Sequence, residues 1–292
     1  MRKLPLLKLI CSMTIFGTIG LALRFTSAER GFVASVRGIL GAALLLFAAL
    51  LMKKWPSVKD IKNNLPRLIA SGMAIGVNWI LLFESYSYTT IAVATLCYYM
   101  APIFVILASP IVLGAKISGQ KYLSVFIAFV GMIFVSGVLS GAETGIAGVL
   151  LALGAAALYA TVTLLNKGLR SISAYDSTIV QLFVAGLTVL PYTIFAEGQR
   201  ISALMGTDIA VLLTVCLLNT AVAYLCYFSS VKDLPAETVA IFSYLDPIVA
   251  VICSLLLREK MTPSVVIGAA LIIGALVLSE IRIKRPNSES NH

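Results

Sequence analysis

Long apolar runs, separated by short charged or turn-rich breaks, extend along almost the whole chain. Each run holds about 20 residues, the length that an α-helix needs to cross a hydrocarbon core about 30 Å thick. Lipid offers no partner for backbone N–H and C=O groups, so we expect every run to be helical. Arg24 interrupts the loose cleavage pattern Thr26-Ser27-Ala28 after the first run, which we therefore expect to remain a span. The pattern predicts an all-α integral membrane protein with ten transmembrane helices, over residues 5–23, 32–52, 66–85, 91–113, 122–139, 145–166, 177–196, 208–230, 237–257 and 263–281.

The composition agrees with this class. Of the 292 residues, 60% are hydrophobic and 12% are charged, and the mean hydropathy is +1.00. Soluble domains are about half apolar and about a quarter charged. The net charge of +9 is divided among short clusters between apolar runs, without the aromatic-interleaved basic face of a nucleic-acid binder. We expect a lipid bilayer as the surroundings and no nucleic acid as a partner.

The distribution of lysine and arginine predicts an orientation. With the N-terminus in the cytoplasm, 16 of the 22 basic residues fall on the cytoplasmic side and five on the other side, and Arg37 lies within a span. Cytoplasmic loops carry such an excess. We therefore expect both termini in the cytoplasm and the protein in the cell inner membrane. The longest basic connection, residues 53–67, is expected either to lie along the anionic inner surface or to form a solvated linker.

The two halves of the chain repeat one another. Residues 78–83 (Asn-Trp-Ile-Leu-Leu-Phe) align with 223–228 (Ala-Tyr-Leu-Cys-Tyr-Phe), and residues 96–103 align with 241–248 at the same offset. Because each half has five spans, an odd number, the second half must enter the membrane from the opposite side. We expect two inverted five-helix repeats, 1–140 and 141–284, and a short polar cytoplasmic tail, 285–292. Inverted repeats are typical of transporters that expose a central site alternately to both faces.

Three patterns resemble those of a known family. They are Val36-Arg37-Gly38 early in the second span, Pro102 and Pro247 within the fourth and ninth spans, and the turns Gly114-Ala115-Lys116 and Arg258-Glu259-Lys260 that follow. With these patterns, residues 5–281 resemble the EamA-like branch of the drug/metabolite transporter superfamily. The resemblance implies transport of a small metabolite and favours export, but names no substrate. The first turn lacks the acid that the second turn keeps as Glu259. The resemblance therefore implies no symmetric role for that acid in the two halves.

Ionisable side chains inside spans need a reason, because one at a helix centre costs at least about 2.5–3.5 kcal/mol. Arg37 either binds a substrate carboxylate or phosphate or acts as a structural or gating clasp, and the resemblance favours the clasp. Glu84, near the outer end of the third span, either accepts an ammonium group or a proton or lies in interfacial water. Asp246 beside Pro247 is expected to titrate or bind a cation if it lies at depth, and to be a helix-end residue if it lies near the inner interface. We expect Arg37, Asp246 and Glu259 to serve coupling or gating.

Polar and aromatic residues at equivalent places in the two halves are candidates for lining a substrate cavity, because aromatic faces can hold a cation or an aromatic substrate. Pro102 and Pro247 are expected to kink their helices, since proline removes a backbone donor. The predicted substrate-binding set is Asn78, Trp79, Glu84, Tyr98, Tyr99, Asn219, Tyr224 and Tyr244, with Tyr159, Asn166 and Gln181 as weaker members.

Several activities lack the residues that they would need. The only histidine is the last residue, His292, and the five cysteines lie inside apolar runs without a C-x-x-C pair, so we expect no metal site and no cofactor. A P-loop is absent, and no nucleophile-and-base set suggests an enzyme. The sequence predicts a secondary transporter for a small amphiphilic substrate such as an amino acid or amine, driven by a proton or by the substrate gradient. A channel and a structural or partner-binding membrane protein are the alternatives, and both monomer and homodimer are open.

Overall fold

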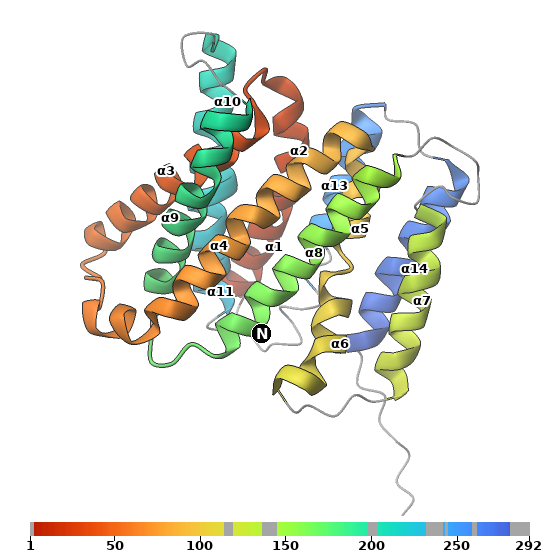
Figure 1. The fold of residues 1–292 in the computed structure, drawn as a ribbon, viewed down its shortest axis with the longest axis horizontal. Coiled ribbons are helices and arrows are strands. Elements are labelled where there is room, and N and C mark those ends of the chain that lie inside the picture. The colour runs from red at the N-terminus through yellow and green to blue at the C-terminus, as the bar shows by residue number, and fades with distance from the viewer. Residues whose placement is uncertain are drawn as a thin grey trace, which may run out of the picture.

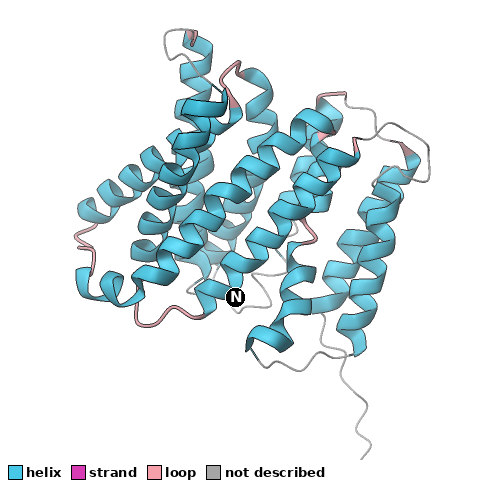
Figure 2. Ribbon diagram, viewed as in Figure 1, coloured by secondary structure: helices cyan, strands magenta, loops and turns pink. Residues whose placement is uncertain are grey.

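The computed structural model describes residues 3–113, 119–135, 145–197, 204–231, 242, 245–258 and 262–280. Within these ranges all regular secondary structure is helical (Figure 2). The first half contains α1 (Lys3–Gly17), α2 (Ile19–Ala22), the 3-10 helix η1 (Leu23–Phe25), α3 (Arg30–Leu51), α4 (Val58–Tyr88), α5 (Ile91–Tyr98), α6 (Ala101–Leu113) and α7 (Gly119–Val135). The second half contains α8 (Ile146–Lys167), α9 (Ala174–Tyr192), the π-helix η3 (Thr193–Glu197), α10 (Gly206–Cys216), the π-helix η5 (Leu217–Val222), α11 (Ala223–Val231), α13 (Leu245–Leu256) and α14 (Pro263–Glu280).

Seven helical segments in the described part of the chain are long and apolar enough to cross a membrane. They are Leu4–Phe25, Arg30–Leu51, Val58–Tyr88, Val93–Val112, Ile146–Asn166, Ala174–Phe195 and Gly206–Tyr227. Two shorter apolar helices cover Tyr122–Phe134 and Pro263–Ala275, and α13 has 12 residues. The ninth predicted span, 237–257, falls partly outside the described residues. The count of ten spans therefore stays a prediction.

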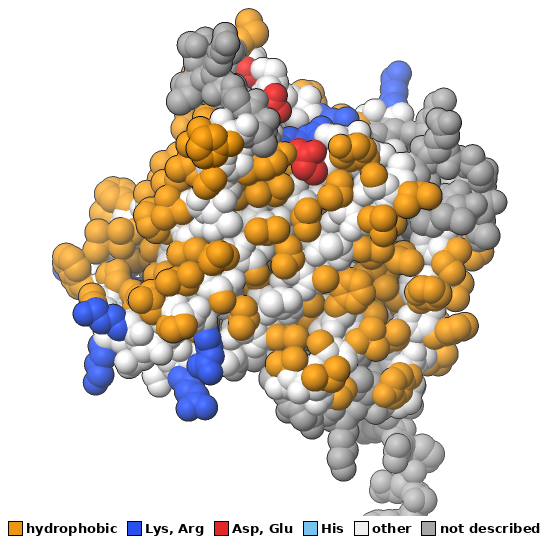
Figure 3. All heavy atoms as spheres, viewed as in Figure 1, with side chains coloured by type: hydrophobic (Ala, Val, Ile, Leu, Met, Phe, Trp, Pro, Cys, Tyr) orange, Lys and Arg blue, Asp and Glu red, His pale blue; other side chains and the backbone are white. Residues whose placement is uncertain are grey.

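Large apolar side chains cover the outside of the helices. Ile111 is 88% exposed, Phe126 64% and Phe47 60%. Figure 3 shows hydrophobic side chains over the middle of the visible face, with lysine and arginine side chains protruding below them. Soluble proteins rarely expose so extended an apolar surface, which is typical of a surface that faces lipid. The described helices form a multi-pass membrane protein.

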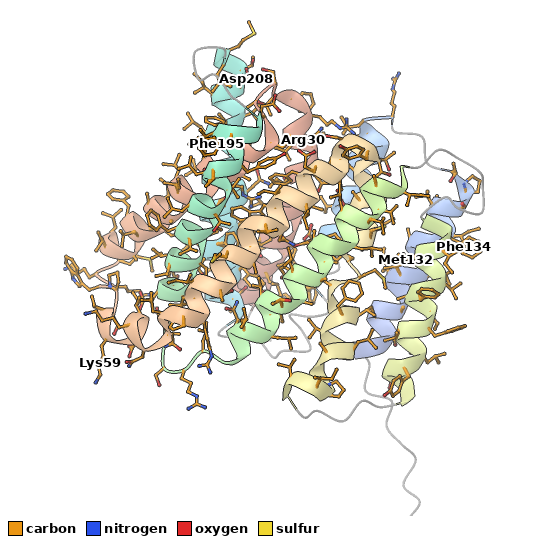
Figure 4. The ribbon with its side chains drawn as sticks, in the orientation of Figure 1. Arg30, Lys59, Met132, Phe134, Phe195 and Asp208 are labelled. Atoms are coloured by element: carbon orange, nitrogen blue, oxygen red, sulfur yellow. The ribbon has the colours of Figure 1, made fainter. Side chains whose placement is uncertain are left out.

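The connection between the second and third spans is shorter than the sequence suggests. α4 begins at Val58, where the Ser57 hydroxyl accepts a hydrogen bond from the Asp60 backbone N–H at 3.4 Å, and it runs for 31 residues. A helix of this length extends roughly 46 Å, beyond a hydrocarbon core of about 30 Å. Residues 58–67 form the first turns of α4, and whether they lie along the anionic surface or in solvent stays a prediction. Hydropathy locates the apolar part of a helix and misses such projecting polar turns, here marked by Lys59 at the lower end of Figure 4.

Hydrogen bonds at the helix ends establish how α4 runs relative to its neighbours. Arg30, at the start of α3, donates to the Phe83 carbonyl near the end of α4 at 3.2 Å. Asn64, near the start of α4, bonds the backbone of Arg170 just after α8, donating at 2.9 Å and accepting at 3.0 Å. α4 is therefore antiparallel to both α3 and α8. We call the end with the starts of α3 and α8 the upper end, as in Figure 1, and the opposite end the lower end.

The first helices of the two halves run in opposite directions. The α1–α2–η1 segment leads to the upper end, where the Ser27 backbone N–H and hydroxyl donate to the Asp208 carboxylate at 2.7 and 2.9 Å. Asp208 lies at the start of α10, and Figure 4 shows it at the upper end near Arg30. α10 therefore runs downward from this end, antiparallel to α1. Since α8 also runs downward, α1 and α8 are antiparallel.

Packing partners recur between the halves (Figure 1). α4 packs on α8 and α9, while the α10–η5–α11 segment packs on α1 and α3. The third span of each half thus contacts the first and second helices of the other half. α3 packs along α9, α5 on α13 and α7 along α14, so that equivalent helices of the two halves also meet.

Candidate functional site

An interrupted helical segment meets the first described turn of α13 near mid-depth. α5 ends at Tyr98 and α6 begins at Ala101, in the middle of the Val93–Val112 span. Pro102 has no N–H to donate to the Tyr98 carbonyl four residues earlier, which is a physical reason for the interruption. α13 begins at Leu245, and the Asp246 carbonyl oxygen lies 2.6 Å from the position that a Cβ on Gly17 would take. Gly17 lies near the centre of the Leu4–Phe25 span, so Asp246 is placed at depth and not at an interface.

The Asp246 carboxylate interacts with tyrosine side chains from several helices. It accepts a hydrogen bond from the Tyr99 hydroxyl at the α5–α6 junction. Four further tyrosines interact with it electrostatically: Tyr86, Tyr98, Tyr159 and Tyr224, from α4, α5, α8 and α11. Asp246, Tyr98, Tyr99 and Tyr224 are partly exposed, and Tyr159 is 45% exposed. We call Asp246, Tyr98, Tyr99, Tyr159 and Tyr224 the Asp246 cluster.

The rings of this cluster meet edge to face. The Tyr98 centroid lies 6.1 Å from that of Tyr99 and 5.7 Å from that of Tyr159, with interplanar angles of 72° and 60°. Tyr224 packs in the same way against Phe16 of α1, at 5.1 Å and 68°. Such arrangements stabilise the relative orientation of the rings, because the positive edge of one meets the negative face of the next. The aromatic side chains are therefore held in place by one another.

Arg37 is enclosed beside the cluster and is 5% exposed. Its guanidinium carbon lies 4.5 Å from the centroid of the Trp79 ring and 6.0 Å from that of Phe83. Its Nε donates to the Thr220 hydroxyl at 3.3 Å. These contacts connect α3, α4 and η5, and they favour the clasp over the ligand role. We call Arg37, Trp79 and Thr220 the arginine clasp.

Asn78 and Asn219 of the predicted set each join helices from different halves. The Asn78 amide of α4 donates to the Ala155 carbonyl of α8 at 2.5 Å. The Asn219 amide of η5 donates to the Ile15 carbonyl of α1 at 2.6 Å. Each asparagine thus links the third span of one half to the first helix of the other. Asn78 also hydrogen-bonds Tyr98, which connects it to the Asp246 cluster.

The remaining predicted residues lie apart from the cluster or outside the described residues. Glu84 is near the upper end of α4, where it accepts a hydrogen bond from the Tyr192 hydroxyl at 2.9 Å. Asn166 accepts from the Gln181 amide at 2.6 Å near the lower end of α8. Tyr244 and Glu259 lie outside the described residues, and so do the side chains of Pro102 and Pro247.

An interrupted helix beside an ionisable residue at mid-depth, within a multi-pass helical bundle, is typical of many membrane transporters. The profile of the EamA-like transporter family matches residues 3–137 and again residues 146–280. The chain belongs to this family, and the resemblance seen in the sequence is confirmed.

Curated relatives also have transporter names. The uncharacterized transporter YxxF of Bacillus subtilis is 28% identical over 256 residues, which cover 86% of this chain and 81% of the relative. An uncharacterized transporter of Clostridium kluyveri is 26% identical over 261 residues, with 85% and 83% covered. Protein RarD of Streptomyces exfoliatus is 26% identical over 248 residues, with 83% and 76% covered. A solved crystal structure at 16% identity has a TM-score of 0.68, covers 94% of this chain and 96% of its own, and is similar in fold alone.

Proposed function

We propose that the protein is a secondary active transporter that exposes the Asp246 cluster alternately to the two sides of the membrane. The arrangement that supports this function is the meeting of the α5–α6 interruption with the start of α13, through the contact of Tyr99 with Asp246. These segments belong to equivalent spans of the two halves. An ionisable group at mid-depth is costly, and such groups usually mark a substrate or ion pathway.

The proposal includes ten spans in two inverted repeats, residues 1–140 and 141–284, with the tail 285–292. The double match of the family profile supports the duplication. The opposite directions of α1 and α8 and the recurring packing partners support the inversion. Two inverted units around a central site can rock against each other and open it to one side at a time.

We place both termini in the cytoplasm, with the protein in the inner membrane. The lower end carries exposed basic side chains at Lys53, Lys54, Lys59, Lys62, Arg67 and Arg170. α1 begins and α14 ends at this same end (Figure 1). An excess of lysine and arginine is typical of the cytoplasmic side.

Asp246 is the proposed coupling residue. Tyr99 hydrogen-bonds Asp246, and Tyr86 from α4, Tyr98 from α5, Tyr159 from α8 and Tyr224 from α11 interact with it electrostatically. Arg37 from α3 interacts electrostatically with Tyr86, Tyr98 and Tyr224. A carboxylate that takes up a proton from outside releases a positively charged group, so proton entry and substrate export would use the same site in turn. We propose export of a small amphiphilic, nitrogen-containing metabolite, an amino acid or an amine.

Flux from sealed proteoliposomes tests this function. Vesicles are loaded with a mixture of labelled amines and amino acids, and efflux is measured with and without an inward proton gradient. The gradient is expected to accelerate efflux in the unmodified protein and in the control Asp60→Asn, which removes a carboxylate from the first turn of α4. Asp246→Asn is expected to lose that response. An equal response in Asp246→Asn would refute the coupling role, and no flux of any solute through folded protein would refute transport.

A further inference from the structure

The two charged residues at the centre differ in what they offer to a ligand. Asp246 is partly exposed, whereas Arg37 is 5% exposed. The guanidinium already has the face of Trp79 at 4.5 Å and the Thr220 hydroxyl at 3.3 Å. Because Arg37 is this deeply buried, a substrate carboxylate would reach it less readily than an ammonium group would reach Asp246. The charge presented to a ligand is therefore the negative one.

The partly exposed groups around Asp246 are phenol rings from different helices. Tyr98 and Tyr99 come from α5 and its junction, Tyr159 from α8 and Tyr224 from α11. Tyr98 lies 5.7 Å from Tyr159 and 6.1 Å from Tyr99, centroid to centroid. Aromatic faces attract a cation within about 6 Å of the centroid, and several rings together form the usual cage for a substituted ammonium ion.

The hydrogen bonds that the cluster can still accept also favour a positively charged ligand over a negatively charged one. A carboxylate accepts about four hydrogen bonds, and the Tyr99 hydroxyl donates one of them to Asp246. The remaining lone pairs can accept from an ammonium N–H. A substrate carboxylate would instead meet the like charge of Asp246, which repels it.

We infer that the Asp246 cluster binds an organic ammonium ion with an apolar or aromatic body and no carboxylate of its own. This inference rests on the proposed function, because it assigns a substrate class to the same site. The sequence predicts either an amino acid or an amine as the substrate, and this inference selects the amine. Asp246 holds the ammonium group, the tyrosine rings surround it, and the arginine clasp takes no direct part.

The assigned substrate class is tested by measuring the binding of three probes to purified protein in detergent. Each probe carries the same phenyl ring. Phenethylamine carries only the ammonium, phenylalanine carries both charged groups, and 3-phenylpropionate carries only the carboxylate. We expect phenethylamine to bind at least about tenfold more tightly than phenylalanine, and the acid not to bind. Asp246→Asn is expected to weaken amine binding about tenfold or more, and Asp60→Asn to leave it unchanged.

A second pair of variants distinguishes the contribution of the Tyr159 ring to binding from that of its hydroxyl. Tyr159→Phe keeps the aromatic face and is expected to keep most of the binding, whereas Tyr159→Ala is expected to weaken it several-fold. Circular dichroism and thermal unfolding of each variant show whether the fold is retained. Equal or tighter binding of phenylalanine, unchanged amine binding in Asp246→Asn, or no binding of any probe at about 10 mM would overturn the inference. Phenylalanine flux without amine binding would refute the inference and keep the transporter, whereas amine binding without any flux would refute the transporter and keep the site.

Discussion

The two halves approach each other backbone to backbone where α3 packs along α9, and Gly38→Ala therefore tests this packing. A Cβ on Gly38 would lie 2.7 Å from both the Cα and the N of Gly186 and 2.8 Å from the Leu182 carbonyl oxygen. These are backbone atoms of a helix, so no side-chain rotation relieves the clash. Favourable carbon–carbon contacts lie at about 3.5–4.0 Å, and the two helices would therefore have to separate by roughly 1 Å.

Gly274→Ala is the matched control, because a Cβ on Gly274 in α14 would meet nothing within 4 Å. Both variants gain the helix propensity of alanine over glycine, up to about 1 kcal/mol, so this gain cancels in the comparison. Overpacking costs about 1–3 kcal/mol, and Gly38→Ala is expected to be less stable than Gly274→Ala by that amount. Thermal unfolding in detergent, followed by circular dichroism, measures the difference. Equal stability of the two variants would show that α3 and α9 are not in the close contact described here.

Three further predictions concern the clasp, the upper end and the orientation. Trp79→Leu removes the ring under Arg37 and is expected to destabilise the fold by about 2 kcal/mol, with Trp79→Phe closer to the unmodified protein, as measured by thermal unfolding; equal stability of Trp79→Leu would contradict the clasp. Asp208→Ala leaves the Thr26 hydroxyl, the Ser27 hydroxyl and backbone N–H, and the Met205 N–H without their carboxylate partner, and is expected to cost about 1.5–3 kcal/mol in the same measurement. A cysteine at exposed Lys59 is expected to react with a membrane-impermeant thiol reagent only from the cytoplasmic side, and one at exposed Thr207 only from the opposite side, and the reverse pattern would invert the topology.

The apolar runs predict much of the fold because the bilayer makes length and hydropathy sufficient signals. The second predicted span, 32–52, corresponds closely to α3, at Arg30–Leu51. The third, 66–85, begins too late, since residues 58–65 are polar helical turns that project from the apolar layer and Pro66 lies inside α4. Hydropathy carries no information about such turns.

The candidate site is predictable to the extent that it repeats between the halves. Tyr98, Tyr99, Tyr224 and Asp246 are at or near the aligned motifs, and the structure brings them together. Tyr159, a weaker member of the predicted set, joins them because α8 packs on α5, a contact between distant segments that no local pattern encodes. Thr220 becomes a partner of Arg37 within the π-helical turn of η5, where its hydroxyl donates to the Val215 carbonyl five residues earlier at 3.1 Å. Phe16, the ring that packs on Tyr224, carries no sequence signal beyond its place next to Gly17.

Access to the Asp246 cluster from the two sides of the membrane tests alternating exposure most directly. A cysteine replaces Tyr159 in a variant whose five native cysteines are changed to serine or alanine, and an impermeant thiol reagent is applied to right-side-out and to inside-out vesicles. Phe126→Cys, at a side chain 64% exposed on the apolar surface, is the lipid-facing control. We predict that position 159 reacts from both sides, that an organic ammonium ion protects it from both, and that position 126 reacts from neither. Reaction of position 159 from one side only, or from neither, would contradict a site that both faces of the membrane reach in turn.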